Sequence, residues 1–104
     1  MLIAPAIALK VAREFLGLSQ DMVEAHSEVS RSTIQRVESG RPDLLHYALR
    51  LQHFYETNGI AFVPPANGSG WGVFNNNTIE DPARLHNLPH VDPRKRRAGP
   101  RVEK

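Results

Sequence analysis

The chain has 104 residues, enough for one domain, and it contains no cysteine, which excludes disulfide bonds, cysteine-ligated zinc and thiol catalysis. Its formal net charge is only +2, and no apolar run approaches the roughly 20 residues that span a membrane. The first twenty residues carry Lys10, Arg13 and Glu14 and lack a basic leader, so we interpret them as a helix rather than a signal peptide. We therefore expect a cytoplasmic protein without a cofactor and without membrane contact.

The basic residues are distributed unevenly. Through residue 57 there are six basic and seven acidic residues, whereas residues 89–104 hold six basic and two acidic ones. The positive charge therefore belongs to the end of the chain. An argument for nucleic-acid binding by the first half must rest on where its few arginines lie.

The first predicted helix begins near Pro5, which suits a first helical turn, and Gly17 ends it. Its apolar stripe is formed by Leu9, Ala12 and Leu16, and we expect Phe15 to widen that stripe. Arg13 falls about 60° around the helix from Leu16, at the edge of the stripe. A half-buried arginine in that position needs a partner.

Residues 18–40 contain two helix starts eleven residues apart. Ser19 and Ser30 are both suited to cap a helix, and each lies between apolar residues at the spacing of a hydrophobic staple. The pairs that form these staples are Leu18 with Val23 and Val29 with Ile34. The sequence predicts a helix over residues 19–26, a turn at residues 27–28 and a helix over residues 30–39 that Gly40 closes. This spacing is typical of a helix-turn-helix.

The second of these helices has a buried and an outward face. Ile34 and Val37 form its apolar stripe, and Glu38 falls about 40° from Ile34, beside that stripe. The positions that point the other way are Ser32, Gln35, Arg36 and Ser39. Both Arg13 and Glu38 are therefore expected at the edges of buried faces.

A fourth helix is predicted to open at Pro42, with an apolar side formed by residues 44, 48, 51 and 55 and broadened by Tyr47 and Phe54. Two short β-prone runs follow, at residues 60–63 and 71–74, separated by a turn at residues 67–70. They predict a β-hairpin or a single strand that must pack on the helices or on another subunit.

The predicted fold is mainly α: a compact four- to five-helix bundle that contains a helix-turn-helix, followed by a short β-hairpin or strand and a disordered tail. We assign residues 1–58 to the DNA-binding domain, residues 59–77 to a β segment that can serve in dimerisation, and residues 78–104 to a flexible basic tail. Residues 94–104 could bind DNA phosphates as a flexible basic segment, or they could only increase the solubility of the chain.

Residues 8–40 resemble the phage-repressor-like (Xre/Cro-like) helix-turn-helix family. The matching features are the arginine at the end of the first helix, the sequence LSQ that opens the second, and VSRSTIQRVESG through the third. The helical resemblance covers roughly residues 6–58. A following segment of the type G-I-A-F-V-P…G-x-G-V, known from small members, extends it to about residue 74.

The resemblance implies which residues meet DNA. Gln20 matches a glutamine that touches a phosphate, and Ser39 and Arg41 lie where a further phosphate contact is often made. Residues at the start of the recognition helix and on its next outward turn match positions that meet base edges and nearby phosphates; they are Ser30, Arg31, Ser32, Thr33, Gln35 and Arg36. Arg13 and Glu38 match a buried structural salt bridge, in agreement with the face analysis.

Two residues depart from the family pattern. The family usually has a small residue at the position of Glu24, where its helices cross, and often has glycine at the position of Glu28. We expect Glu28 to adopt a left-handed backbone conformation, which costs about 1 kcal/mol for a residue other than glycine. We expect the side chain of Glu24 to crowd the contact between the two helices and to alter their crossing angle.

The five histidines are scattered, so we expect no metal site, and no group of serine, histidine and acid indicates catalysis. The sequence predicts a non-enzymatic, nucleoid-associated transcription regulator, a repressor that binds double-stranded DNA as a homodimer. Helix four and the hairpin, with Trp71 and Phe74, are the candidate dimer surfaces. The alternatives are an antitoxin or anti-activator that acts mainly on a protein partner, and an architectural DNA binder that depends on the tail.

Overall fold

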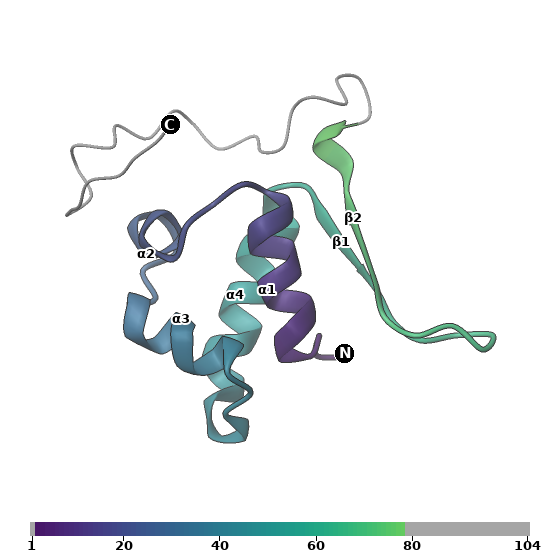
Figure 1. Ribbon diagram of the computed structural model, residues 1–104, viewed down its shortest axis with the longest axis horizontal. Coiled ribbons are helices and arrows are strands. Elements are labelled where there is room, and N and C mark those ends of the chain that lie inside the picture. The colour runs from purple at the N-terminus through teal and green to yellow at the C-terminus, as the bar shows by residue number, and fades with distance from the viewer. Residues whose placement is uncertain (1, 79–104) are drawn as a thin grey trace.

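The computed structural model describes residues 2–78 of the chain. Its elements are four helices, α1 (Ala6–Phe15), α2 (Gln20–Ser27), α3 (Arg31–Glu38) and α4 (Leu45–Thr57), and two strands, β1 (Ile60–Val63) and β2 (Gly72–Asn75). The helices form a bundle, and the hairpin lies on the side away from α2 and α3 (Figure 1). The predicted mainly α fold, with its helix-turn-helix and hairpin, is confirmed. Residues 79–104, where we expected the tail, lie outside the described residues.

Helix α1 starts one residue later than Pro5 because Pro5 itself has an extended backbone and caps the helix. Its carbonyl accepts from the backbone N–H of Ala8 at 2.9 Å and of Leu9 at 3.1 Å. At the other end the N–H of Leu18 donates to the carbonyl of Arg13 at 3.1 Å, a bond of the Schellman type that stops the helix. Phe15 does not widen the buried stripe as expected, since 37% of its surface is exposed.

Helices α2 and α3 are each started by a serine, as the sequence predicts. Ser19 Oγ accepts from the N–H of Met22 at 3.1 Å, and Ser30 Oγ accepts from the N–H of Thr33 at 3.2 Å. Between the helices Glu28 adopts the left-handed conformation, with φ 65°. Gly40 closes α3 at φ +88°, a conformation that suits glycine, and the N–H of Arg41 donates to the carbonyl of Arg36 at 3.3 Å.

The chain enters α4 through a 3-10 turn at Pro42–Leu44. The buried residues of α4 include Ala48, Leu51 and Tyr55, as expected, but Tyr47 lies outside the core with 37% of its surface exposed. The core draws on all four helices and on β1; its largest fully buried side chains are Tyr55, Leu9, Leu16, Ile34, Leu51, Val23 and Val29. Both staple pairs of the helix-turn-helix are therefore buried.

Buried Gln52 is a feature of α4 that the apolar pattern does not reveal. Its Oε1 accepts from the N–H of Ala4 at 2.8 Å, and its Nε2 donates to the carbonyl of Leu2 at 3.3 Å. The amide of Gln52 thus binds one N–H and one carbonyl of the first segment, as a neighbouring strand would. This contact fixes the chain ahead of α1 against α4.

The two strands pair in antiparallel register, with Ile60 opposite Asn75 and Val63 opposite Gly72. The inner face packs on the helices, β1 against α4 and β2 against α1. Buried Asn75 fastens the hairpin, because its Nδ2 donates to the carbonyl of Phe15 at 2.9 Å at the end of α1. Asn77 Nδ2 donates to the carbonyl of Asn58 at 2.9 Å at the end of α4. The polar residues that follow the second apolar run are therefore anchors of the fold.

Candidate nucleic-acid interface

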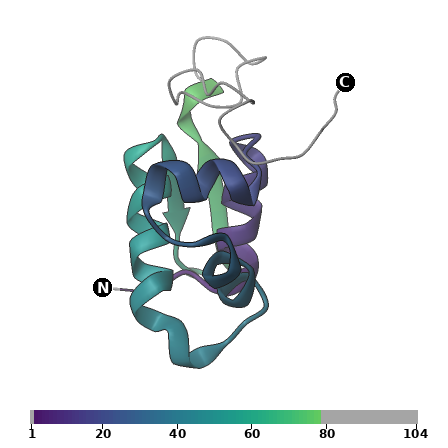
Figure 2. The same cartoon turned by 90° about the vertical axis from the view of Figure 1, so that its left-hand side faces the viewer.

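Helices α2 and α3 form one face of the molecule. Figure 2 shows both on the near side, in front of α1 and α4, with the hairpin behind. The outward side of α3 carries four exposed residues, Arg31, Ser32, Gln35 and Arg36. Ile34 and Val37 on its other side are buried, so packing fixes which side of α3 faces outward. The helix thus presents polar hydrogen-bonding groups from a fixed position.

The first turn of α3 is held together by its own hydroxyl groups. Ser30 Oγ accepts from the N–H of Thr33 and donates to Thr33 Oγ1 at 2.9 Å, and the hydroxyl oxygens of Ser30 and Ser32 lie 3.3 Å apart. Ser30 is exposed and Thr33 is half-buried. At this end of the helix Ser30 and Thr33 are engaged in capping, and Arg31 and Ser32 extend outward.

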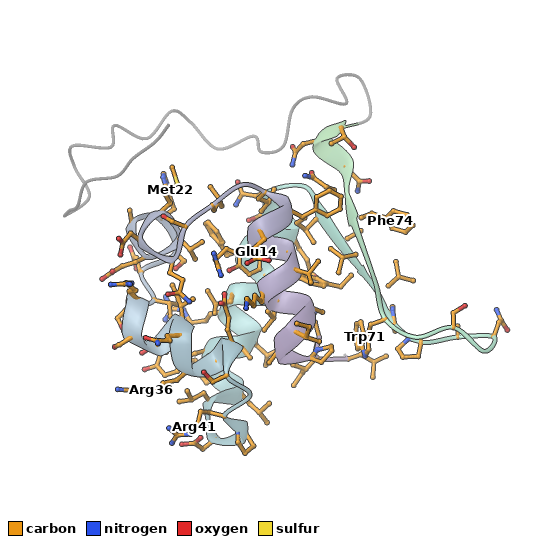
Figure 3. The ribbon with its side chains drawn as sticks, viewed as in Figure 1. Glu14, Met22, Arg36, Arg41, Trp71 and Phe74 are labelled. Carbon is orange, nitrogen blue, oxygen red and sulfur yellow. The ribbon has the colours of Figure 1, made fainter. Side chains whose placement is uncertain are left out.

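The three arginines of this face have different partners. Arg31 Nε lies 3.5 Å from Asp21 Oδ1, an ion pair that links α3 to α2. Arg41 Nε and Nη2 donate to the two carboxylate oxygens of Asp43 at 3.2 and 3.1 Å. Arg36 is exposed and forms no ion pair within residues 2–78. Figure 3 shows Arg36 and Arg41 projecting outward, on the side opposite to Trp71 and Phe74.

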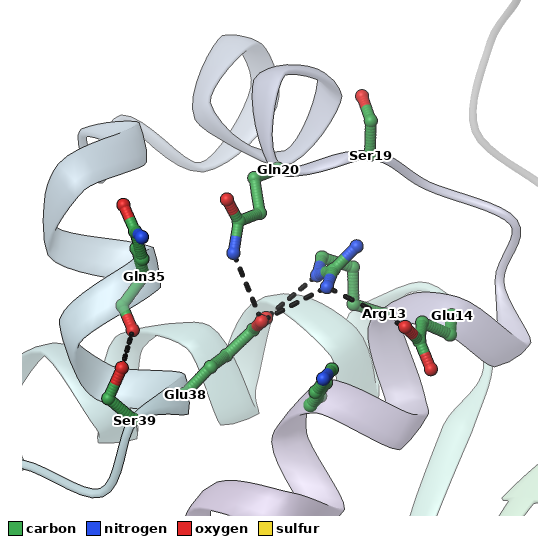
Figure 4. A pocket seen from close by; sticks show the side chains of 8 residues that line it. Arg13, Glu14, Ser19, Gln20, Gln35, Glu38 and Ser39 are labelled. Carbon is green, nitrogen blue, oxygen red and sulfur yellow. Dashed lines mark hydrogen bonds and ion pairs between the residues drawn. The ribbon is translucent and has the colours of Figure 1, made fainter.

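Arg13 and Glu38 form the buried ion pair that the sequence predicts (Figure 4). Arg13 Nε donates to Glu38 Oε2 at 2.7 Å and Nη2 donates to Oε1 at 3.0 Å, while 11% and 6% of the two side chains are exposed. Arg13 Nη1 also donates to the carbonyl of Leu18 at 2.9 Å. The fork of Arg13 thus binds α3 and the start of the helix-turn-helix at once.

The pair also stabilises the charged form of the guanidinium. The hydrogen bonding of Arg13 to the Glu38 carboxylate raises the pKa of Arg13 above its ordinary value and outweighs burial, which acts in the opposite direction. Tyr55 lies in the field of both groups, but burial is the main reason that its pKa is raised. Its hydroxyl is buried and has no hydrogen-bond partner within residues 2–78.

Gln20 joins this network, which the sequence did not indicate. Its Nε2 donates to Glu38 Oε1 at 3.1 Å, so one carboxylate oxygen accepts from both α1 and α2. Gln20, Gln35 and Ser39 line an open cleft of about 490 Å³ between α1, α2 and α3, together with Lys10. Ser39 Oγ donates to the carbonyl of Gln35 at 2.8 Å. Lys10 is a cation at this site that we did not predict, because nothing in its local sequence separates it from other exposed lysines.

The two departures from the family pattern have different outcomes. Glu28 adopts the left-handed conformation that the turn requires, as expected. Glu24 is exposed, so its carboxylate remains in water and does not crowd the crossing of α2 and α3. The expectation of crowding at Glu24 was wrong, because α2 turns Val23 rather than its neighbour into the core.

Three of the five histidines, His26, His46 and His53, line a second open cleft of about 510 Å³ between α2 and α4. Within residues 2–78 no group of three or more histidine, aspartate or glutamate residues is arranged to hold a metal ion. In the same part of the chain, no helix has the length and the apolar character needed to cross a membrane.

Comparison with known proteins supports the helix-turn-helix fold. The family model described as "Helix-turn-helix domain" matches residues 6–58, the segment that runs from α1 to the end of α4. No curated protein and no solved structure matches the chain.

Proposed function

This chain belongs to the Xre/Cro-like helix-turn-helix family, and we propose that it is a sequence-specific DNA-binding regulator of transcription. In this proposal the protein is a repressor that occupies its operator as a symmetric homodimer. The observation that carries this proposal is the outward side of α3. It is polar, its position is fixed by buried Ile34 and Val37, and its Arg36 forms no ion pair within residues 2–78. The recognition helix of each subunit would enter one of two successive major grooves, about one helical turn apart.

Base reading is assigned to exposed residues on the outward side of α3. Arg36 has no acidic partner to give up within residues 2–78, so its planar fork is available for the O6 and N7 atoms of guanine. Ser32 and Gln35 present hydrogen-bonding groups beside it on the same exposed side. We therefore propose Arg36 as the main determinant of sequence preference, with Ser32 and Gln35 contributing.

Phosphate contacts are assigned to the residues around this centre. Arg31 and Arg41 each form a surface ion pair, which is worth only about 0–1 kcal/mol and can be exchanged for a phosphate. Gln20 uses one N–H of its amide on Glu38 and retains a second, which we propose binds a phosphate at the start of α2. The hydroxyl groups of Ser30, Thr33 and Ser39 lie at the two ends of α3, where the backbone of DNA would pass.

A test of this assignment compares single substitutions on DNA selected for tight binding. We expect Arg36→Ala to weaken binding by about 1–3 kcal/mol, roughly 5- to 150-fold, and to relax the preference at one base pair. Arg41→Ala should weaken binding to all DNA sequences alike, and it should reduce the salt dependence of the affinity by about the contribution of one phosphate contact. Arg50→Ala, which removes an exposed arginine of α4, is the matched control. Unchanged affinity in both Arg31→Ala and Arg36→Ala would contradict the proposed role of α3.

One observation favours a second candidate function. Seven acidic residues against six basic ones through residue 57 give this region less attraction for DNA than a purely electrostatic binder would have. An antitoxin or anti-activator would bind mainly a protein partner and DNA only secondarily. In that case the arginine substitutions of α3 would leave the regulatory effect in cells intact even where they weaken DNA binding.

A further inference from the structure

The outer face of the hairpin lacks the polar residues that a solvent-exposed sheet face normally carries. The register places Ala61, Val63, Gly72 and Phe74 on this face, opposite to the side that packs on the helices. Phe74 is 61% exposed and Val63 is 39% exposed. Antiparallel strands with one face in water usually alternate apolar and polar residues. Apolar residues on both faces indicate that this hairpin is covered in the functional assembly.

A second row of exposed apolar side chains runs along α1. Ile7, Val11 and Phe15 follow one another at intervals of four residues and are 64%, 40% and 37% exposed. Arg13 on the other flank of α1 faces α3. β2 packs against α1, and Asn75 of β2 binds the carbonyl of Phe15. We name Ile7, Val11, Phe15 and Phe74 the α1–β2 patch.

The edge of β2 lies between these two sets of apolar side chains. Within residues 2–78, β2 pairs with β1 on one side only, in a two-stranded sheet. The N–H of Asn76 donates to the carbonyl of Gly59 at 2.7 Å, which sets the alternation of the ladder. With that alternation Phe74 exchanges bonds with Ala61, and the N–H and carbonyl of Val73 turn to the outer edge. A strand edge bordered by apolar side chains is the surface that strand addition uses.

We propose that a second copy of this chain covers the α1–β2 patch, with the two β2 strands paired in antiparallel orientation across a two-fold axis near Val73. The inference rests on the proposed homodimer and identifies its surface. A two-fold axis perpendicular to a strand makes that strand antiparallel to its own copy, so the outer edge of β2 can pair with the same edge of a second chain. Pairing centred on Val73 places Phe74 across from Gly72 of the partner subunit, where the absent side chain leaves room for the ring.

The size of the patch also fits a second copy. Side chains of this size at these exposures present on the order of 400 Å² of apolar surface. That is about half of the roughly 800 Å² that each partner contributes to a stable interface, and paired strands and polar groups at the rim supply the rest.

Dimerisation here leaves the candidate DNA surface open. Phe74 and Trp71 lie on one side of the molecule and Arg36 and Arg41 on the other (Figure 3). The assembly would therefore hold two outward α3 helices in a fixed relation without covering either. Four central strands would also stabilise a hairpin that is marginal as an isolated pair.

Sedimentation of the full chain without DNA tests the proposal and does not depend on its DNA-binding activity. We expect the wild type to sediment at twice the 11.7 kDa of one chain. Phe74→Glu and Ile7→Glu, on different elements, should each raise the dimer dissociation constant at least 100-fold with unchanged helical circular dichroism. Tyr47→Glu is the matched control, since Tyr47 is as exposed as Phe15 but belongs to α4. A monomeric wild type, or a dimer that persists in both patch variants, would overturn the proposal.

Photo-crosslinking identifies the occupant directly. With p-benzoylphenylalanine at position 74 and mixed light and heavy isotope labels, we expect crosslinks between a light and a heavy chain within α1 or β2. A crosslink within one chain to residues 79–104 would show that the chain covers its own patch and would refute the dimer. If the patch variants become monomeric while Arg36→Ala leaves DNA binding unchanged, the interface stands and the proposed role of α3 fails.

Discussion

Separating Arg13 from Glu38 should destabilise the protein severely, whereas replacing both should not. Only 11% and 6% of the two side chains are exposed, and Glu38 accepts from Arg13 through both oxygens. Removing one partner leaves the other charge buried, which typically costs about 3–5 kcal/mol. A domain of this size is stable by only about 5–15 kcal/mol, and each kcal/mol lowers Tm by roughly 4–8 °C. We therefore expect Arg13→Met or Glu38→Leu alone to lower Tm by more than about 12 °C.

The double variant Arg13→Met with Glu38→Leu removes both charges and fills the space with apolar side chains. It should lose less stability than either single variant, with a coupling of about 2–3 kcal/mol measured in urea by circular dichroism. In the double variant Gln20 and the carbonyl of Leu18 lose hydrogen-bond partners, so its free energy of unfolding should not exceed that of the wild type. If the two single losses simply add in the double variant, the groups do not act as a pair and the reasoning fails.

Three smaller changes test other parts of the fold. Tyr55→Phe should leave the free energy of unfolding unchanged or raise it by up to about 1 kcal/mol, because the buried hydroxyl has no hydrogen-bond partner within residues 2–78. A loss above about 1 kcal/mol in urea unfolding would contradict this and would show that the hydroxyl forms a stabilising contact. Asn75→Ala should lower stability by about 1–3 kcal/mol, since it leaves the carbonyl of Phe15 unpaired, and hydrogen exchange should show the hairpin opening first. Glu28→Gly should raise stability by up to about 1 kcal/mol, because glycine adopts φ 65° without strain, and a fall in Tm would contradict this.

The helix-turn-helix could be predicted from the sequence because its signals are local. Ser19 and Ser30 bind N–H groups three residues ahead, and the staple residues of the same helices fall into the core at fixed spacing. Arg13 and Glu38 could also be placed, since each lies at the edge of a helical stripe. These arguments need only the period of one helix.

The remaining features depend on contacts between segments far apart in the chain. Gln52 binds the segment ahead of α1 across 48 and 50 residues, and Asn75 binds the carbonyl of Phe15 across 60. Phe15 continues the helical pattern, but 37% of its surface is exposed, so it lies at the edge of the core. Gln20 reaches Glu38 only after α2 and α3 have packed. The spacing of apolar residues along a single helix does not predict such contacts between distant segments.

Selection of DNA from a random pool with the full chain tests the central claim most directly. The account predicts an enriched site with two inverted half-sites, centred about 10–10.5 base pairs apart, and a guanine in each half-site whose enrichment disappears with Arg36→Ala. An enriched pool without a shared motif, or a motif that Arg36→Ala leaves intact, would contradict the assignment of α3 as the helix that reads DNA.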